Sequence, residues 1–209
     1  MIGIIDYGMG NLRSVQKAFE AAGNPATLTR DSQELCGFSG LVLPGVGAFG
    51  RAMENLHKLG IAKKIVEEVG GGKPFLGICL GLQLLFSRSE ESFGNLSEKG
   101  LDIIPGVVHR FPADLKVPQI GWNQIVVKKD SVLLKEIPKD GYVYFVHSYY
   151  VKPYQPEVVL TTTDYGMEFV SSVAVDNVYA IQFHPEKSST LGLKILKNFG
   201  EIVSERRLG

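Results

Sequence analysis

Cys79, His184 and Glu186 are the residues whose types and spacing could support nucleophilic catalysis. Cys79 stands at the centre of "GICLG", with one glycine two positions before it and another two positions after it. This spacing is that of a nucleophile elbow, in which a strand turns sharply into a helix, with cysteine in place of serine. The helix N-terminus that follows would favour the reactive thiolate, and the amide of Leu80 would point at a developing oxyanion.

The pentapeptide alone leaves two interpretations of Cys79 open. Free cysteine is among the most buried residue types, so a structural thiol between a strand and a helix fits the pattern as well as a nucleophile does. A nucleophilic cysteine needs a base, and the base needs a group that orients it. The choice between the two interpretations therefore depends on the rest of the sequence.

The residue best placed to act as that base is His184. It ends the apolar run "VYAIQF" and is followed by Pro185 and Glu186. In an α/β sheet, chemistry gathers where strands end, and the proline would present both side chains on a stiff turn. A strand-end histidine beside a helix-capping glutamate is the alternative. The other histidines lie in a polar helical stretch, in a strand-like segment, and in a strand where we expect the ring nitrogens to be satisfied: His57, His109 and His147.

The loop "LPGVGAFG" follows an apolar run and carries Gly45, Gly47 and Gly50. Such a loop can donate backbone N–H groups to an anion, but it lacks the lysine of a nucleotide-binding P-loop. We expect it to form an oxyanion or substrate wall beside Cys79, with an ordinary strand-to-helix turn as the alternative. No helical i, i+4 pair or C-x-x-C spacing supports a metal site, so we expect no metal and no cofactor.

The elements that must position these residues follow from hydrophobic patterning. In the first half, apolar runs predict strands at 2–6, 25–30, 40–45 and 74–79, and helical spacing predicts helices at 12–23, 49–72 and 80–89. Near-continuous apolar strands between helices indicate a parallel sheet covered on both faces. The second half is rich in Val, Tyr, Phe and Thr, which predicts mostly strands, several of them antiparallel, before a closing helix at 190–205. We expect one α/β domain over residues 1–209.

Composition excludes several classes of function. The chain has 209 residues, is 44% hydrophobic, and carries 22 basic and 22 acidic residues, so no net basic field would recruit nucleic acid. No apolar run approaches the roughly 20 residues of a membrane span, and the first residues read as a mature strand rather than a signal peptide. Two cysteines, Cys36 and Cys79, disfavour a disulfide framework and favour a reducing, cytoplasmic compartment.

Taken together, "GICLGLQLLF" and the later "HPEKS" resemble the class I, triad-type glutamine amidotransferases. The segments "IDYGMGNLRSV", "LPGVGAF", "PQIGWN" and "YFVHSYY" narrow the resemblance to the glutaminase subunits of imidazole glycerol phosphate synthase, of histidine biosynthesis. The resemblance spans essentially the full chain, with the motifs in the expected order. It implies a flavodoxin-like, three-layer α/β fold with a mostly parallel central sheet, helices on both faces and an added antiparallel β portion.

The resemblance also implies a role for each matching position. Cys79 would attack the side-chain amide of glutamine to form a thioester, with His184 as base and then acid, and Glu186 as its orienting group. Backbone N–H groups for the oxyanion would come from Val46, Gly47 and Leu80, and the glutamine pocket from Gly47, Gln83, Ser148 and Tyr149. Val46 interrupts a loop that is more glycine-rich in other amidotransferases, which suggests an oxyanion hole that is incomplete at rest and forms when a peptide reorients.

A partner is the last implication of the resemblance. A (β/α)₈-barrel cyclase subunit would form a heterodimer with this chain, receive the ammonia in trans, and make imidazole glycerol phosphate and aminoimidazole carboxamide ribotide. The positions that match partner-facing ones are Asn11, Trp122, Tyr144 and Lys187. A core role for Trp122 and a solvated charge for Lys187 are the alternatives. We expect no nucleic-acid or membrane partner.

Three other functions stay open on the sequence. A glutaminase of another pathway, such as vitamin B6 or aminobenzoate synthesis, is disfavoured by "YGMGN" and "PQIGWN". A non-catalytic regulatory subunit is disfavoured by the intact cysteine, histidine and glutamate. A cysteine peptidase or esterase would act on peptides or esters without a partner.

Overall fold

The computed structural model describes residues 1–91 and 98–206, and its centre is a group of parallel strands. These strands are β1 (Ile2–Ile5), β2 (Ala26–Thr29), β3 (Gly40–Gly45) and β4 (Phe75–Cys79). β1 pairs in parallel with β2 and β3, and β3 pairs in parallel with β4. Every residue of β1, β3 and β4 is buried, as expected for strands that are covered on both faces.

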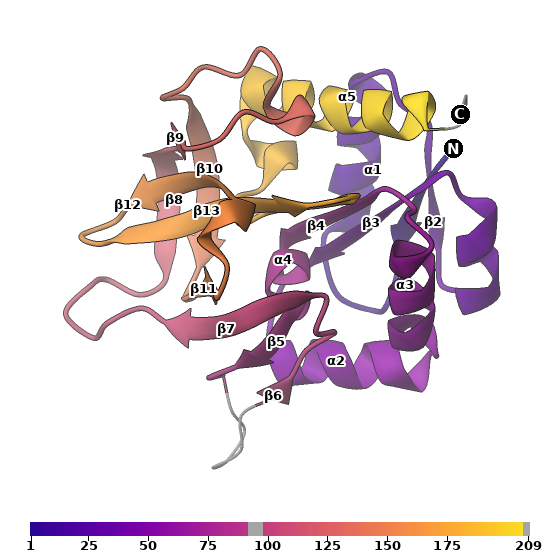
Figure 1. Ribbon diagram of the computed structural model, residues 1–209, viewed down its shortest axis with the longest axis horizontal. Helices are drawn as coiled ribbons and strands as arrows, with labels where there is room; N and C mark the ends of the chain where they lie inside the picture. The colour runs from indigo at the N-terminus through magenta and orange to yellow at the C-terminus, as the bar shows by residue number, and fades with distance from the viewer. Residues whose placement is uncertain (92–97, 207–209) are drawn as a thin grey trace.

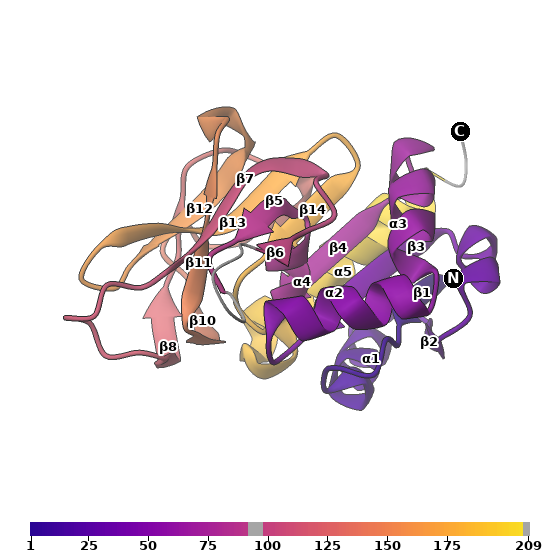
Figure 2. The same ribbon diagram turned by 90° about the horizontal axis from the view of Figure 1, so that it is seen from below.

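Helices cover both faces of this parallel core (Figures 1 and 2). They are α1 (Leu12–Ala21), α2 (Phe49–Lys58), α3 (Ile61–Gly70), α4 (Leu80–Leu84) and α5 (Ser189–Glu205). On one face, α1 and α5 meet through Phe19 and Phe199, whose ring centroids lie 6.2 Å apart. On the other face, α2 and α3 bury Leu56 and Ile65 in a second cluster. None of the helices in the described ranges has the length and apolar character needed to cross a membrane.

The second half adds strands that are mostly antiparallel. They are β5 (Phe86–Ser89), β6 (Glu98–Lys99), β7 (Ile104–Arg110), β8 (Gln119–Gln124), β9 (Val126–Val127), β10 (Tyr142–His147), β11 (Tyr149–Pro153), β12 (Val159–Asp164), β13 (Glu168–Val175) and β14 (Val178–Ile181). Short 3₁₀ turns lie at η1 (Ser32–Gly37), η2 (Val132–Leu134), η3 (Pro156–Val158) and η4 (Pro185–Lys187).

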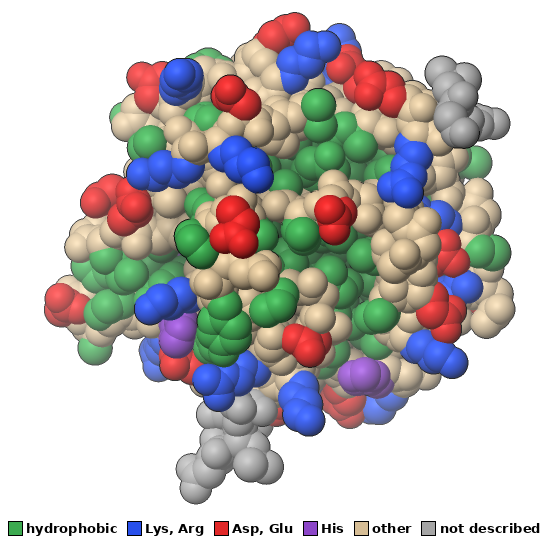
Figure 3. All heavy atoms as spheres, in the orientation of Figure 1, with side chains coloured by type: hydrophobic (Ala, Val, Ile, Leu, Met, Phe, Trp, Pro, Cys, Tyr) green, Lys and Arg blue, Asp and Glu red, His purple; other side chains and the backbone are tan. Residues whose placement is uncertain are grey.

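Strand β14 joins the two halves, because it pairs in parallel with β4 and antiparallel with β13. The main sheet runs β2-β1-β3-β4-β14-β13-β11-β7-β5-β6, with β12 and β9 attached beside β13, and β8 and β10 form a separate antiparallel pair. This arrangement confirms the predicted fold class. On the face shown in Figure 3, acidic and basic side chains are interspersed, in line with the net charge of zero.

The helix predicted at 80–89 is wrong in its second half. Helix α4 ends at Leu84, and strand β5 begins at Phe86. The carbonyl oxygen of Leu84 accepts a hydrogen bond from the backbone of Leu101, and β5 pairs with β7 in parallel. The apolar spacing of this segment fits either structure, and pairing with residues distant in the sequence decides in favour of a strand.

Gly81 allows α4 to pack directly against β3. A Cβ atom at this position would overlap the carbonyl oxygen of Leu43. We expect Gly81→Ala to lower the free energy of unfolding by about 3 kcal/mol, because the backbone of β3 would have to move. Chemical denaturation measures this change. Gly70→Ala at the end of α3, where an added Cβ meets no atom within 4 Å, is the control and should be neutral or slightly stabilising. Equal effects of the two substitutions would contradict the explanation.

Candidate active site

Cys79 occupies the sharp turn that the sequence predicts between a strand and a helix. It is the last residue of β4 and the N-cap of α4, with φ 56° and ψ −108°. L-residues rarely adopt this conformation, and its energy must be supplied by the surrounding structure. The flanking glycines make room for the turn, since a Cβ on Gly77 would collide with the backbone of Gly81 and Leu82. The elbow is therefore a tightly packed element.

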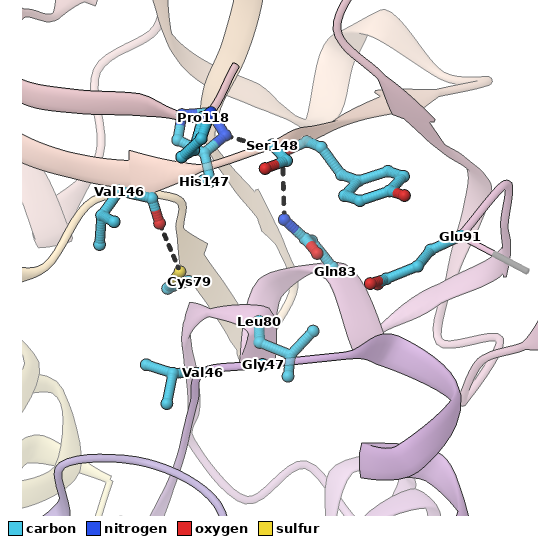
Figure 4. A pocket seen from close by; sticks show the side chains of 11 residues that line it. Val46, Gly47, Cys79, Leu80, Gln83, Glu91, Pro118, Val146, His147 and Ser148 are labelled. Carbon is cyan, nitrogen blue, oxygen red and sulfur yellow. Dashed lines mark hydrogen bonds between the residues drawn. The ribbon is translucent and has the colours of Figure 1, made fainter.

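Two groups among the described residues form hydrogen bonds with the Cys79 sulfur. The thiol can donate to the carbonyl oxygen of Val146 at 3.8 Å, a contact that Figure 4 shows. The side-chain Nε2 of Gln182 donates to the sulfur at 3.6 Å. Cys79 is only 5% exposed, so the sulfur lies at the floor of the site rather than on the surface.

His184 and Glu186 form a buried pair just beyond β14. Nδ1 of His184 lies 2.8 Å from Oε1 of Glu186, and the side chains are 3% and 2% exposed. Burial lowers the pKa of His184, but the interactions with the Cys79 thiolate and with Glu186 outweigh burial and raise it to about 10. Nε2 of His184 has no hydrogen-bond partner among the described residues, so His184 interacts with the sulfur through its charge. The site therefore favours the imidazolium form of His184.

A cavity of about 310 Å³ opens above Cys79 (Figure 4). The structure brings to this cavity the residues that the sequence assigned to the oxyanion and to the substrate: Val46, Gly47, Leu80, Gln83, Ser148 and Tyr149. Glu91 and Pro118 also line it, although no motif in the sequence indicates them. The predicted pocket residues, which come from three separate segments of the chain, therefore share one cavity.

Gln83 and Glu91 present oxygen atoms to this cavity. Nε2 of Gln83 donates to the carbonyl oxygen of Tyr149 and to Oε1 of Gln182, each at 3.1 Å. A primary amide has two N–H hydrogens, so Gln83 has only its oxygen left for a ligand. Glu91 Oε2 accepts a hydrogen bond from the backbone N–H of Phe49 at 2.8 Å, which fixes the carboxylate at the start of α2. Figure 4 shows the Glu91 carboxylate on the Gln83 side of the cavity.

Tyr7 lies beneath the elbow, where the sequence analysis did not place it. Its side chain is completely buried, and a Cβ on Gly45 would overlap its hydroxyl. Gly45 is the partner of Cys79 in the register of β3 and β4. Burial, and then the charge of Cys79, hold the pKa of Tyr7 well above its usual range. Tyr7 is therefore uncharged, and its hydroxyl fills the space that a side chain at position 45 would need.

The prediction that His147 is a satisfied strand histidine is confirmed. Nδ1 lies 2.7 Å from the carbonyl oxygen of Tyr149, and Nε2 lies 2.9 Å from Oε1 of Gln119. A neutral ring donates from one nitrogen only, here Nδ1 to the Tyr149 carbonyl, and a half-turn of the Gln119 amide lets its NH₂ group donate to Nε2. Burial and the nearby His184 lower its pKa to about 4, against an opposing effect of the hydrogen bond to Tyr149. His147 is therefore neutral at physiological pH and supports the wall of the cavity.

This pKa predicts a loss of stability in acid. Between pH 6.5 and about 4, unfolded chains protonate residue 147 while folded chains do not, so acidification should favour unfolding. One proton is worth about 1.4 kcal/mol per pH unit, which gives a loss of ~3 kcal/mol over this window. Urea denaturation from pH 7 to pH 4 measures it. His147→Gln should show a shallower dependence, and the exposed His57→Gln should match the wild type. Identical pH dependence in wild type and His147→Gln would contradict the assignment.

The predicted partner-facing residues lie beside the catalytic pair. Trp122 is 53% exposed, so it does not belong to the core, and its ring contacts Tyr144 edge-on at 6.2 Å. Nζ of Lys187 lies 5.6 Å from the centre of the Tyr144 ring. Asn11 and Lys187 line a small crevice that reaches His184 and Glu186. Asn11 and Lys187 therefore lie next to the catalytic pair, and Tyr144 and Trp122 are connected to Lys187 through side-chain contacts.

Comparison with known structures shows the same fold in amidotransferases. A structure described as glutamine amidotransferase has a TM-score of 0.76 at 20% identity and covers 97% of this chain and 98% of its own. The structure of PurLQS from Thermotoga maritima has a TM-score of 0.73 at 18% identity, covering 99% of this chain and 98% of its own. At these identities the likeness shows the fold alone.

Comparison of sequences is more specific. Residues 3–202 match the family "Glutamine amidotransferase class-I". The chain is 54% identical over 202 residues to the imidazole glycerol phosphate synthase subunit HisH of Moorella thermoacetica, covering 97% of this chain and 95% of the relative. It is 53% identical over 197 residues to the HisH subunit of Aquifex aeolicus, covering 94% of each. The chain thus belongs to the class-I glutamine amidotransferase family, among the HisH subunits of imidazole glycerol phosphate synthase.

Proposed function

We propose that this chain hydrolyses L-glutamine to L-glutamate and ammonia through a thioester on Cys79, and that it delivers the ammonia to a cyclase subunit. The observation that carries the proposal is a strained, buried cysteine at the floor of a cavity, beside a buried His184–Glu186 pair. We further propose that residues 1–209 act as one amidotransferase domain. This assignment sets the roles of the remaining pocket residues.

In the first half of the reaction, the Cys79 thiolate attacks the side-chain amide carbon of glutamine. A C–S bond forms, and the carbonyl electron pair moves onto oxygen, where backbone N–H groups of Leu80 and of the Val46–Gly47 segment stabilise the charge. The oxyanion then collapses, the C–N bond breaks, and the His184 imidazolium gives its proton to the leaving nitrogen. Ammonia leaves, and the glutamyl thioester remains on the sulfur.

In the second half, the neutral imidazole of His184 removes a proton from water as the water oxygen attacks the thioester carbon. The C–O bond forms, the C–S bond breaks, and glutamate leaves while the thiolate and imidazolium are restored. Glu186 holds the ring in one orientation and stabilises its positive charge through the bond at 2.8 Å.

The cavity also accounts for recognition of the amino-acid end of glutamine. The Gln83 oxygen and the Glu91 carboxylate are acceptors suited to the substrate's α-ammonium group. No lysine or arginine in the described ranges lines the cavity, so we assign the α-carboxylate to backbone N–H groups of the Ser148–Tyr149 wall. A substrate held at both charges would place its side-chain amide toward the elbow.

Ammonia is rapidly protonated and diluted in water, so its product site must be next to a consumer. We assign the consumer to a (β/α)₈-barrel cyclase subunit that forms a heterodimer with this chain and makes imidazole glycerol phosphate and aminoimidazole carboxamide ribotide. The exposed Trp122, the Tyr144–Lys187 contact and the crevice beside Asn11 support docking on this face. Aromatic residues with cationic neighbours are frequent anchors of protein interfaces.

Trp122→Ala should weaken binding of the cyclase subunit. Removal of a central aromatic anchor costs about 2 kcal/mol, or ~30-fold in Kd. Isothermal titration calorimetry with the cyclase measures the change. Val66→Ala on α3, another exposed apolar position (45%) but away from this face, should leave Kd unchanged. If Trp122→Ala and Val66→Ala bind the cyclase subunit with the same Kd, the interface lies elsewhere on the chain.

The function itself is tested by a glutaminase assay on the purified chain, with and without the cyclase subunit and its nucleotide ligand. We expect glutamate release that rises when both are added. Turnover of peptides or esters by the isolated chain, with no release of glutamate from glutamine, would show a hydrolase of another kind.

A further inference from the structure

Gln182 forms a buried link between the substrate pocket and the nucleophile. It lies between β14 and His184 and is completely buried. Its Nε2 donates to the Cys79 sulfur at 3.6 Å, and its Oε1 accepts a hydrogen bond from Gln83 at 3.1 Å. Its backbone N–H donates to the carbonyl oxygen of Ser171 at 2.8 Å, so β13 fixes its main chain. Neither the elbow nor the His184–Glu186 pair explains this arrangement.

The two hydrogen bonds at the sulfur favour opposite protonation states. The carbonyl oxygen of Val146 can only accept, so its contact with Cys79 requires a neutral S–H group. The Gln182 amide donates, and a thiolate accepts a stronger hydrogen bond than a thiol does because it carries a full charge. Gln182 therefore stabilises the nucleophilic form of Cys79, whereas Val146 stabilises the inactive one.

We propose that Gln182 is a further catalytic residue of the glutaminase reaction. Its side-chain amide holds the Cys79 sulfur as a thiolate, and it makes the ionisation of this thiol depend on whether substrate is bound at Gln83. This inference rests on the proposed function, because only there is the thiolate the nucleophile. A substrate ammonium at the Gln83 oxygen polarises that amide and strengthens its N–H donation to Gln182. The Gln182 amide is polarised in turn, so its bond to the sulfur strengthens as well.

The test is the pH dependence of alkylation of Cys79 by iodoacetamide. It is carried out in a Cys36→Ser background, because Cys36 is exposed and would also react. Gln182→Met keeps the length of the side chain and removes the donor. We expect it to raise the pH midpoint of alkylation by about one pH unit, because a hydrogen bond to a charged group is lost. We also expect kcat for glutamine to fall about tenfold, because less thiolate is present at neutral pH.

Asn198→Leu is the matched control. Asn198 is a buried amide on α5 that donates to the carbonyl oxygens of Leu133 and Lys135, away from the site. Its replacement removes a buried amide at a similar cost in stability but should leave the alkylation midpoint unchanged. A folded Gln182→Met chain with the wild-type midpoint would overturn the proposal, and so would an equal shift in Asn198→Leu.

A second measurement needs no substitution at position 182. In the wild-type chain, the side-chain ¹⁵N–¹H₂ chemical shifts of Gln182 should change with pH, and the midpoint of this change should equal the midpoint of Cys79 alkylation. Chemical shifts that do not change with pH would overturn the proposal. The alkylation midpoint and the Gln182 chemical shifts both report the protonation state of the Cys79 thiol and do not depend on turnover of glutamine. A chain that shows the Gln182 effect but releases no glutamate from glutamine would refute the proposed function while leaving the Gln182–Cys79 interaction established.

Discussion

Cys79→Ala should abolish glutamine-dependent turnover, with kcat lowered on the order of 10⁴-fold or more, as for removal of the nucleophile from other catalytic triads. No other cysteine can replace it, because Cys36 is exposed on η1, outside the cavity that Cys79 lines. Steady-state release of glutamate measures the loss. The complex with the cyclase should still synthesise its product when ammonium salt is supplied, because only the source of ammonia is removed.

Two controls make this result specific. Cys36→Ala should retain wild-type turnover, and the circular dichroism spectrum of Cys79→Ala should show an intact fold. Glutamine-dependent turnover that persists in a folded Cys79→Ala chain would mean that another group is the nucleophile. Loss of the ammonium-dependent reaction as well would mean that the substitution disrupts docking rather than chemistry.

The cyclase and its nucleotide should together raise kcat for glutamine by about 10²–10³-fold over the isolated chain, because one oxyanion donor is worth that much. The peptide between Val46 and Gly47 is suited to supply the missing donor. Val46 is 43% exposed, and Gly47 has φ 98°, so rotation of this peptide would not open the core. We expect a docked partner to favour the orientation in which the N–H group faces the oxyanion.

Val46→Gly tests the same idea in the isolated chain. The β-branched valine restricts backbone rotation at this position, and glycine removes the restriction. Basal glutaminase activity should rise, and activation by the partner should shrink in proportion. Val46→Ala keeps a Cβ and should show a smaller gain. Full activity of the isolated wild-type chain would remove the need for any reorientation.

The comparisons also decide among functions that the sequence motifs left open. A glutaminase of vitamin B6 or aminobenzoate synthesis would not be expected to match HisH subunits at about half identity over nearly the whole chain. Retention of the cysteine, histidine and glutamate in a buried, charge-coupled arrangement argues against a non-catalytic role.

The sequence predicted those parts of the site that depend on short-range spacing. The glycines around Cys79 define a turn, and the proline between His184 and Glu186 fixes the backbone between these two residues. Both motifs can therefore be predicted from the sequence without a structure. The parallel core was predictable for the same reason, because its strands are apolar throughout. The division of 80–89 into a helix and a strand was not, because it depends on pairing with β7.

Polar residues without a motif were missed. Gln182 contacts Cys79 across 103 positions and Gln83 across 99, so nothing in its neighbourhood in the sequence indicates those partners. Glu91 and Tyr7 have the same property, since each acquires its role from packing of distant segments. The sequence offers one signal for Gln182, a polar glutamine within an apolar run two residues before the base. The segment "VYAIQF" is nevertheless typical of an ordinary strand.

The backbone of Cys79 implies a trade-off between stability and activity. At φ 56° and ψ −108°, a side chain costs about 1–3 kcal/mol that glycine would avoid. Thermostability alone would therefore select glycine at position 79, and chemistry alone selects cysteine. Cys79→Gly should therefore raise the melting temperature of this chain while it abolishes ammonia production.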